Sequence, residues 1–540
     1  MNGIYQTKEQ LTELLCELVA VPSISRTIEE NKMAGKIKEK IARIPYYQEH
    51  PDHLRLHATY DGRGIITALA KKENAKKTIV LISHFDVVSV EDYGAWQEEA
   101  FQPKVLTELM RKNMEEYAED VQEDLQSGEW LFGRGTMDMK AGLALHMSMI
   151  EQACAGEFEG NLLLLTVPDE EVSSVGMREA VPVLEQLAKE HDLTYELVLN
   201  GEPMFSLYPG DTNHYIYTGS IGKLLPGVYC YGRETHVGEP FLGLNASLMN
   251  SFVTQEIELN TDFCEQSGTQ ISPPPTALFH RDLKKDYSAQ IPNRAASLYN
   301  VLTMDRSVEK TTEMLREAAD RAAVNINEFY QTRNNRYDQL AKTNNDHSFD
   351  IKVMTFAELK AYAKEHIAPE ILENLESDVL KRQDHLDDRE LSIELVDQYA
   401  LLCKELAPMI VLFYAPPFYP AVQSQGEQAK TWTELLMKYA GDQHQIDFQI
   451  APYFNGICDL SYVSLQEDIE KVNIYISNVP VWGKTYDMPI EAMKRLQVPV
   501  LNLGPVGRDA HQQTERLHTE YAFVTLKDLT EFLLHQVFRG

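Results

Sequence analysis

The sequence has little cysteine, and its cysteines follow no recognisable spacing. Only six occur among 540 residues, and no two of them form a C-x-x-C pair. A zinc site built from thiolates and a framework of disulfides both need cysteines at characteristic spacings. The sequence therefore argues against both kinds of site, and we predict a protein of a reducing compartment, the cytoplasm.

The chain is also short of positive charge and of long hydrophobic runs. Lysine and arginine total 50 against 82 aspartates and glutamates, a formal net charge of −32, which repels nucleic acid phosphates and anionic membrane surfaces. No stretch approaches the ~20 apolar residues that span a bilayer. The N-terminal segment has a capping box at Thr7 and Gln10, which is typical of a core helix and not of a signal peptide. We expect no nucleic acid and no membrane as partners.

Short β-rich runs alternate with helical patterns along the chain. Strands alternating with helices predict an α/β sheet, whose ligands gather where strands end and loops begin. A charged segment, 105–126, is predicted to be a solvated surface helix. The predicted strands, each followed by polar or glycine-rich sequence, are 78–83, 162–167, 196–199, 472–477 and 498–503.

The chain is longer than a single hydrophobic core usually supports. The stretch 219–417 differs in texture from its surroundings, with long charged helical patterns at 307–323 and 387–407. A sheet-like pattern resumes after it. We therefore predict a main domain in two parts, 1–218 and 418–540, with 219–417 inserted between them.

Acidic and imidazole groups stand where the predicted strands end. His84 and Asp86 follow an apolar run, and the strand period of two puts both side chains on one face. A carboxylate beside a histidine can orient its ring as a metal ligand, although a structural His-x-Asp is the more common case. Asp138 follows a turn in which Gly133 and Gly135 permit sharp backbone geometry. An N-cap of the next helix is the alternative for Asp138.

Three carboxylates come together directly after the strand 162–167. Asp169, Glu170 and Glu171 would repel one another unless cations or protons compensate their charge. Four consecutive leucines before them place this cluster at the edge of a core, and a solvated turn is the alternative. Glu202 ends another apolar run, where a strand-end cap would also explain it.

One more histidine, His511, follows the last apolar run and a Gly-Pro turn. Together these groups supply two histidines and three carboxylates at one edge of a sheet. Such donors suit zinc or a similar divalent ion. The predicted metal ligands are His84, Asp138, Glu171, Glu202 and His511.

The order of these motifs resembles the M20 metallopeptidases, which include carboxypeptidases, aminoacylases, di- and tripeptidases and desuccinylases. The chain carries His-x-Asp-Val, Gly-Arg-Gly-x-x-Asp-Met-Lys, Asp-Glu-Glu, Gly-Glu-Pro and Ala-His-x-x-x-Glu in the family's order. Five ordered motifs are far more specific than any one of them. The resemblance implies an α/β fold with a two-metal exopeptidase-like catalytic domain, a mixed sheet flanked by helices, and an inserted, enlarged α+β lid domain.

The resemblance also implies how the metals would be held. His84 and Glu202 would bind one ion, Glu171 and His511 the other, and Asp138 would bridge them. The resemblance also implies a cis peptide bond after Asp138. The implied cofactors are two divalent metal ions, zinc first, with cobalt and manganese also suited to these ligands.

Three further residues take catalytic roles by the same resemblance. Asp86 would brace His84, and Glu170 would be the general base. His236 matches a lid histidine that polarises the substrate carbonyl. In dimeric relatives that histidine enters the partner subunit's active site, but this lid is long enough to supply it within one chain. A homodimer and a monomer with an enlarged lid are both open.

Two features of the sequence leave site assignments open. Cys458 precedes Asp459 where the family has Ser or Thr before the aspartate, which leaves their role at the substrate site open. His518 competes with His511 for the last ligand position. Glu515 follows His511 at the family's spacing, and we therefore favour His511.

The expected activity is metal-dependent hydrolysis of an amide bond, in a small peptide or an N-acyl amino acid. The enlarged lid and the strings APPFYP and DLSY are most similar to an arginine-utilisation subgroup, which suggests amino-acid catabolism. A non-catalytic, metal-containing binding protein of the same fold is the alternative, and Glu170 argues against it because a binder needs no base. A one-metal enzyme is a further alternative, which a metal content near one ion per chain would indicate.

Overall fold

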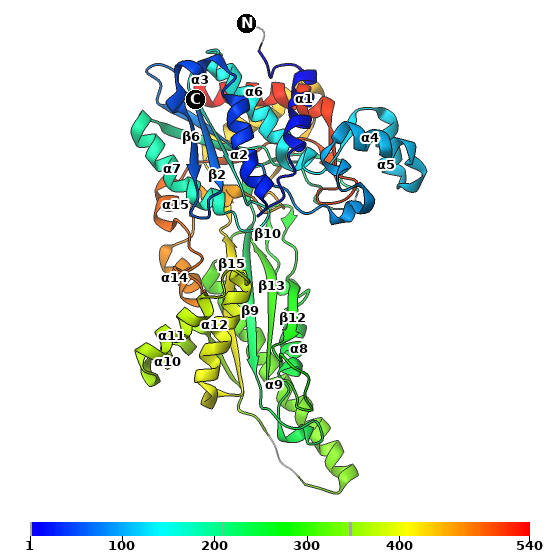
Figure 1. Cartoon of the computed structure of the whole chain (residues 1–540), viewed down its shortest axis with the longest axis vertical. Coiled ribbons are helices and arrows are strands. Elements are labelled where there is room, and N and C mark those ends of the chain that lie inside the picture. Colours follow the sequence, from blue (N-terminus) through cyan, green and yellow to red (C-terminus); the bar gives the residue numbers. More distant parts are fainter. Residues whose placement is uncertain (1–2, 209, 345–347) are drawn as a thin grey trace. The chain divides into compact units, whose positions relative to one another are not determined.

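The chain divides into two units, each with its own sheet and core (Figure 1). The computed structural model describes residues 3–208, 210–344 and 348–540. Unit 1 comprises Met1–Ile221, Ala421–Gln466 and Pro489–Gly540, and unit 2 comprises Gly222–Pro420 and Glu467–Met488. The predicted insert, 219–417, matches the first segment of unit 2 closely but does not include the second segment, Glu467–Met488. None of the helices in the described ranges combines the length and the apolar composition that a bilayer crossing requires.

Unit 1 is built on an eight-stranded mixed sheet, in the order β1-β2-β5-β3-β6-β18-β7-β17. β3 runs parallel to both β5 and β6, so three neighbouring strands have their carboxyl ends at one edge. Four of the five predicted strands are confirmed here. The strands are β1 (Leu54–Ala58), β2 (Gly64–Ala70), β3 (Lys77–His84), β5 (Asn161–Val167), β6 (Thr194–Asn200), β7 (His214–Tyr217), β17 (Phe448–Ala451) and β18 (Val500–Asn502).

Helices cover both faces of the central strands. Every residue of β2 and β5 is buried, and alternate side chains of a strand point to opposite faces, so neither face is open to solvent. α2 (Ile28–Ile41) and α7 (Val175–His191) pack on β2, and α6 (Ala141–Cys154) packs on β2, β3 and β5. α1 (Lys8–Val19) begins at the predicted capping box of Thr7 and packs on α6.

The remaining elements of unit 1 are shorter strands and peripheral helices. β4, β19 and β20 form a separate three-stranded sheet, and β8 pairs with β16. Their bounds are β4 (Trp130–Phe132), β8 (Gly219–Ser220), β16 (Val422–Gln423), β19 (Gly507–Arg508), β20 (Arg516–His518), α3 (Pro45–Glu49), α4 (Pro103–Lys112), α5 (Glu119–Ser127), α13 (Glu427–His444), α15 (Ile490–Leu496) and α16 (Leu526–Arg539).

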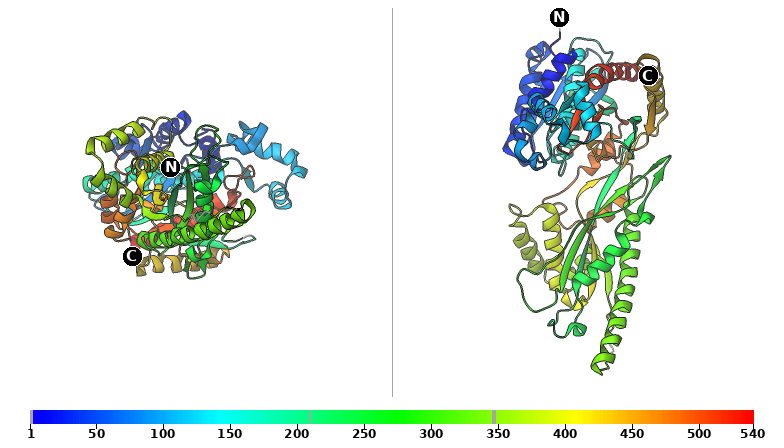
Figure 2. Two further views of the ribbon diagram at one scale, coloured as in Figure 1. Left: turned by 90° about the horizontal axis from the view of Figure 1, so that it is seen from below. Right: turned by 90° about the vertical axis from the view of Figure 1, so that its right-hand side faces the viewer.

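Unit 2 is built on a five-stranded sheet, in the order β12-β13-β9-β15-β14, with helices on both faces (Figure 2). On β13, Ser297 and Tyr299 bond to residues of α8, whereas the alternate residue Leu298 packs in the core under α10 and α12. The elements are β9 (Gly222–Tyr231), β10 (Gln266–Ser267), β11 (Gln270–Ile271), β12 (Thr276–Asp282), β13 (Arg294–Thr303), β14 (Lys352–Thr355), β15 (Met409–Tyr419), α8 (Ala246–Ile257), α9 (Val308–Ala341), α10 (Phe356–His366), α11 (Pro369–Leu380), α12 (Asp388–Leu402) and α14 (Ile469–Asn478).

Two of the local predictions were wrong. The predicted strand 472–477 is part of helix α14, which buries Val472 and Tyr475 on one face at helical spacing. Its alternating β-branched residues imitated a strand, but packing in unit 2 selects the helix. The predicted helix 105–126 is two helices, α4 and α5. Both are partly buried, with Leu106 and Val121 in one apolar cluster with Trp130.

The buried strand β5 offers a test of the core of unit 1. Leu164 lies between Ala68 of β2 and Leu81 of β3 and is fully buried. Leu164→Ala leaves a cavity, and we expect the free energy of unfolding in urea to fall by ~2–5 kcal/mol. Leu56→Ala is the matched control, because Leu56 on β1 is 44% exposed and its loss should cost about 0.5 kcal/mol or less. Equal losses would contradict this placement of the core.

Candidate metal centre

Three parallel strands deliver side chains to one edge of the sheet of unit 1. β3 ends at His84, β5 ends just before Asp169, and β6 ends just before Glu202. His84 pairs in register with Val167, the last residue of β5. The chain therefore leaves both strands at the same level, and the residues that follow meet at the edge where α/β sheets hold their ligands.

A second, smaller sheet brings two further groups together. β4 leads directly into the turn that contains Asp138, and β20 pairs with β4, with Arg516 opposite Phe132. β19 and β20 form the hairpin whose loop carries His511. Because the turn and the hairpin leave the same small sheet, Asp138 and His511 become neighbours despite their distance in sequence.

Asp138 lies between the two histidines. Its Oδ1 is 3.2 Å from Nε2 of His84, and its Oδ2 is 3.2 Å from Nε2 of His511. Glu202 Oε1 lies 3.4 Å from the same nitrogen of His84, and Glu171 Oε2 lies 3.1 Å from that of His511. Each histidine therefore has one carboxylate of its own and shares Asp138. The structure brings all five predicted ligands together.

Among the described residues, His84, Asp138 and Glu171 form the group of three whose ligand atoms all lie within 4.8 Å of one another. The side chains of these three residues are at most 8% exposed, whereas that of His511 is 48% exposed. A cluster with one accessible side is an arrangement that an ion and a substrate can enter. The part of the site that faces solvent is the His511 loop.

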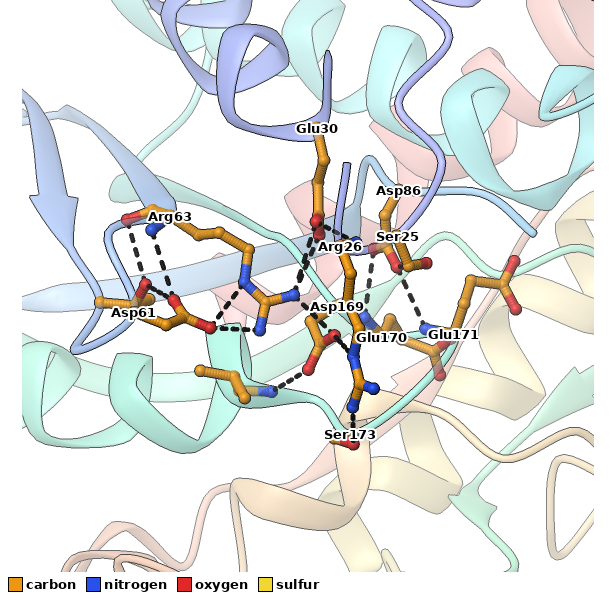
Figure 3. A network of polar contacts seen from close by, with 12 residues as sticks. Ser25, Arg26, Glu30, Asp61, Arg63, Asp86, Asp169, Glu170, Glu171 and Ser173 are labelled. Atoms are coloured by element: carbon orange, nitrogen blue, oxygen red, sulfur yellow. Dashed lines mark hydrogen bonds and ion pairs between the residues drawn. The ribbon is translucent and has the colours of Figure 1, made fainter. Parts of the chain in front are cut away.

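Asp86 contacts His84 and also holds the acidic turn at Glu170 and Glu171, and Figure 3 shows the contacts with the turn. His84 Nδ1 lies 3.1 Å from the carbonyl oxygen of Asp86, an acceptor that leaves Nε2 facing the carboxylates. The Asp86 carboxylate accepts hydrogen bonds from the amides of Glu170 (3.1 Å) and Glu171 (3.3 Å) and from the hydroxyl of Ser25 (2.7 Å). The sequence predicted only that Asp86 braces His84. Its hydrogen bonds to the turn were missed because no local sequence pattern shows where backbone amides point.

Glu515 fixes the backbone that leads to Asp138. Its buried carboxylate accepts hydrogen bonds from the amides of Gly135 (2.7 Å) and Met137 (3.4 Å) and from Nη1 of Arg134 (2.8 Å). The peptide bond after Asp138 is cis, as the resemblance implied. Sequence reasoning missed Arg134, although the Gly-Arg-Gly motif that contains it was the available signal.

Glu202 and Glu171 hold protons more tightly than usual because they are buried beside other carboxylates, whereas hydrogen bonds from His511 and His84 lower the pKa of Asp138. Burial raises the pKa of Glu202 to about 8, and the charges of Asp138 and Glu171 add to this rise while His84 opposes it. Burial and the charge of Asp138 likewise raise the pKa of Glu171. Hydrogen bonds to Asp138 and Glu171 raise the pKa of His511 to about 11. Divalent ions would replace these protons as the compensating charge, and two imidazoles with three carboxylates fit such ions.

Glu170 stands beside the ligand cluster. Its Oε2 is 3.9 Å from Nε2 of His84, and its side chain is 9% exposed. Burial raises its pKa well above the usual value, and the charges of Glu202, Asp459 and Glu171 add to the rise. A carboxylate with a raised pKa is suited to exchange a proton near neutral pH.

A sequence model of a known protein family matches most of this chain. The model for Peptidase family M20/M25/M40 matches residues 80–534. The chain belongs to this family. Two proteins of Bacillus subtilis strain 168 are similar over nearly their whole length. The uncharacterized protein YqjN is 45% identical over 531 residues, 98% of this chain and 96% of that protein. Protein RocB is 30% identical over 534 residues, 96% and 93% of the two.

Solved structures match this fold over nearly the whole chain. A metallo-carboxypeptidase of the family from Sulfolobus solfataricus matches with a TM-score of 0.53 at 15% identity, over 98% of this chain and 99% of that one. A tripeptidase from Staphylococcus aureus matches with a TM-score of 0.52 at 12% identity, over the full length of both chains. The predicted M20 fold class is confirmed, and the chain is an enzyme of the M20 type.

His518 and His236, also singled out in the sequence, have partners of their own. His518 forms an ion pair with Glu129 (3.3 Å) and packs edge-on against Trp130, so the structure does not bring it to the carboxylates. His236 belongs to unit 2, where it is exposed and its Nδ1 accepts a hydrogen bond from the amide of Gly238.

The Cys458 and Asp459 pair lies in unit 1, and both residues are buried. The thiol of Cys458 donates a hydrogen bond to the hydroxyl of Ser220 (3.2 Å). Asp459 begins a short 3₁₀ turn (Asp459–Tyr462), and burial raises its pKa to about 7. Its charge contributes to the raised pKa of Glu170. Asp459 therefore lies near the centre, whereas the Cys458 thiol is bonded to another side chain.

Metal binding at this M20 centre should release protons. With a pKa of about 8 on Glu202 and about 11 on His511, these two side chains carry protons at neutral pH when no metal is bound, and an ion must displace those protons. We expect affinity for zinc or cobalt to fall as the pH drops from about 8 to about 6. Calorimetric titration in buffers of different ionisation enthalpy measures the released protons. A binding enthalpy that is the same in every buffer would contradict this account.

Proposed function

We propose that this chain hydrolyses an amide bond, peptide or N-acyl, in a small peptide or an N-acyl amino acid. Two divalent ions would be held by His84 and Glu202 and by His511 and Glu171, with Asp138 shared. The observation that carries this proposal is the placement of the two Asp138 oxygens, each 3.2 Å from a different histidine. A carboxylate that faces two such nitrogens is suited to link two neighbouring ions.

Divalent ions bound there would polarise an amide carbonyl and lower the pKa of a water molecule from ~15.7 towards ~7. Glu170 would accept the proton of that water on its carboxylate and then donate it to the nitrogen of the leaving amine. The amide of Glu170 is held by Asp86, which limits the directions in which its side chain can point. His236 is proposed to donate a hydrogen bond to the developing oxyanion.

Two observations bear on the substrate. The solved neighbours include a tripeptidase and a carboxypeptidase, whose substrates are peptides. The chain also resembles an arginine-utilisation subgroup, and it is 30% identical to Protein RocB. We therefore propose a role in amino-acid catabolism and include arginine derivatives among the substrates to be tested.

Replacement of Glu170 by glutamine tests the base. The change keeps size and removes the proton acceptor, so we expect kcat for the best amide to fall by ~10²- to 10⁴-fold with metal content unchanged. Release of free amine is measured on dipeptides and N-acyl amino acids, including arginine derivatives, with zinc- or cobalt-loaded protein. Glu159→Gln is the control, because that side chain is 74% exposed and its loss should leave kcat unchanged.

Two results would count against the proposal. A Glu170→Gln variant with wild-type turnover would remove Glu170 as the base. Wild-type protein that binds metal, remains folded and releases amine from no member of the panel would favour a binding protein over a hydrolase.

A further inference from the structure

The turn that carries Glu170 and Glu171 begins with an unusual residue. Asp169 is fully buried and has a φ of +68°, in the left-handed region that residues other than glycine rarely adopt. Its carbonyl oxygen accepts hydrogen bonds from the amides of Ser173 (3.1 Å) and Ser174 (2.6 Å). The direction in which the next two side chains leave this turn therefore depends on how Asp169 is held.

Arg63 holds the side chain of Asp169. The Arg63 guanidinium is buried, and its Nη1 lies 2.6 Å from Oδ1 of Asp169. Its Nε and Nη2 donate to Oδ2 of Asp61 at 2.9 and 2.6 Å, and Nη1 is also 3.4 Å from Oε1 of Glu30. Figure 3 shows the guanidinium among these three carboxylates. The other Asp169 oxygen, Oδ2, accepts a hydrogen bond from the amide of Val175 (3.1 Å).

The same network reaches the turn from a second side. Glu30 accepts a hydrogen bond from the amide of Arg26 (2.6 Å), and the neighbouring Ser25 donates to Asp86 (2.7 Å). The Asp86 carboxylate in turn accepts hydrogen bonds from the amides of Glu170 and Glu171. The turn is thus fixed at its amides by Asp86 and at its first side chain by Arg63, and the segment 25–30 joins the two.

A purely stabilising role explains Arg63 poorly. A buried ion pair is weak evidence for stability, because desolvation of the charges offsets much of their attraction. What the guanidinium supplies here is geometry, since its planar fork bonds several carboxylates at fixed angles, as a lysine ammonium cannot. Such fixed geometry matters beside a reaction centre, where a displacement of about 1 Å can cost ~10²-fold in rate.

We propose that Arg63 is a positioning residue for the reaction. By holding Asp169 in its left-handed conformation, Arg63 directs Glu171 towards the other proposed metal ligands and Glu170 towards the reacting water. Arg63 would act on the reaction through the turn and not by contact with the substrate. The kinetic part of this inference rests on the proposed function, whereas its geometric part concerns the metal site alone.

Arg63→Lys keeps the charge and removes the fork. We expect the visible absorption bands of the cobalt-loaded protein to shift or weaken, because Glu171 is displaced from its position in the cluster. We also expect kcat to fall ~10- to 100-fold with KM within about threefold of wild type, the pattern of an interaction lost mainly in the transition state. The thermal unfolding midpoint reports whether the variant remains folded.

The matched control is Arg55→Lys. Arg55 lies on β1 of the same sheet and forms an ion pair with Glu190 (2.6 Å), in which both side chains are about one-third exposed. The same chemical change there should leave the cobalt bands, kcat and KM unchanged.

Asp169→Asn tests the same contact from the other side and can be used if Arg63→Lys does not fold. Asp169→Asn retains an acceptor for the Val175 amide and removes the charge that Arg63 holds. We expect the same change in the cobalt bands and in kcat as for Arg63→Lys. Where both variants fold, the double variant should add little, because both act through one contact.

The outcomes separate this inference from the proposed hydrolase. Wild-type cobalt bands in the folded Arg63→Lys variant, or in Asp169→Asn, would overturn the positioning role. Fully additive effects in the double variant would overturn it as well. If the wild-type protein cleaves no amide while the variants still change the cobalt bands, the hydrolase proposal fails and the positioning of Glu171 by Arg63 stands.

Discussion

Negative charge gathered at a buried edge of a sheet is the constraint on which the site of unit 1 depends. The acids there fall into two groups. The first group has permanent partners within the chain, which are backbone amides for Asp86, Arg63 for Asp169, and Arg134 with two amides for Glu515. The second group, Asp138, Glu171 and Glu202, faces histidine nitrogens that would have to lose protons for the proposed metal ions to bind. The fold therefore leaves a defined set of charges for cations to compensate.

The two groups depend on each other. Acids with permanent partners act as fixed acceptors that hold turns, as Asp86 does for the amides of Glu170 and Glu171. Glu515 does the same for the backbone ahead of Asp138. Ligand side chains on turns held in this way are already close to their partners before any ion arrives. Less reorganisation is then needed when metal or substrate binds.

Much of this arrangement could be predicted from the sequence, because strand ends are visible in it. Apolar runs that stop at His84 and Glu202 place both residues at a sheet edge by local reasoning alone. The pairing of Asp138 with His511 is different, since it depends on the small sheet formed by β4, β19 and β20, and only the order of family motifs pointed to it. The segment around Val472 was misjudged because its β-branched residues imitate a strand while tertiary packing makes it helical.

The partners that hold the site were the least predictable part. Arg63 lies far from the acidic turn in sequence, and nothing local distinguishes it from an arginine on a solvated hairpin. Its role appears only when β1 and β2 are placed beside β5. Ser25 and Arg134 are similar cases, since each acts through specific contacts with residues distant in sequence and not through a repeating pattern. Periodicity predicts which elements form, but it carries no information on single contacts between distant segments.

The central claim is that Asp138 serves two ions at once, and metal content measures this most directly. Wild-type protein and the Asp138→Ala variant are loaded with zinc and freed of excess metal by gel filtration. Elemental mass spectrometry then gives the zinc concentration, which is divided by the protein concentration to give zinc ions per chain. The account predicts about two ions per chain in the wild type and one or fewer in the variant, since loss of a shared ligand weakens both positions. Two ions retained by folded Asp138→Ala protein, or a wild-type content near one, would contradict it.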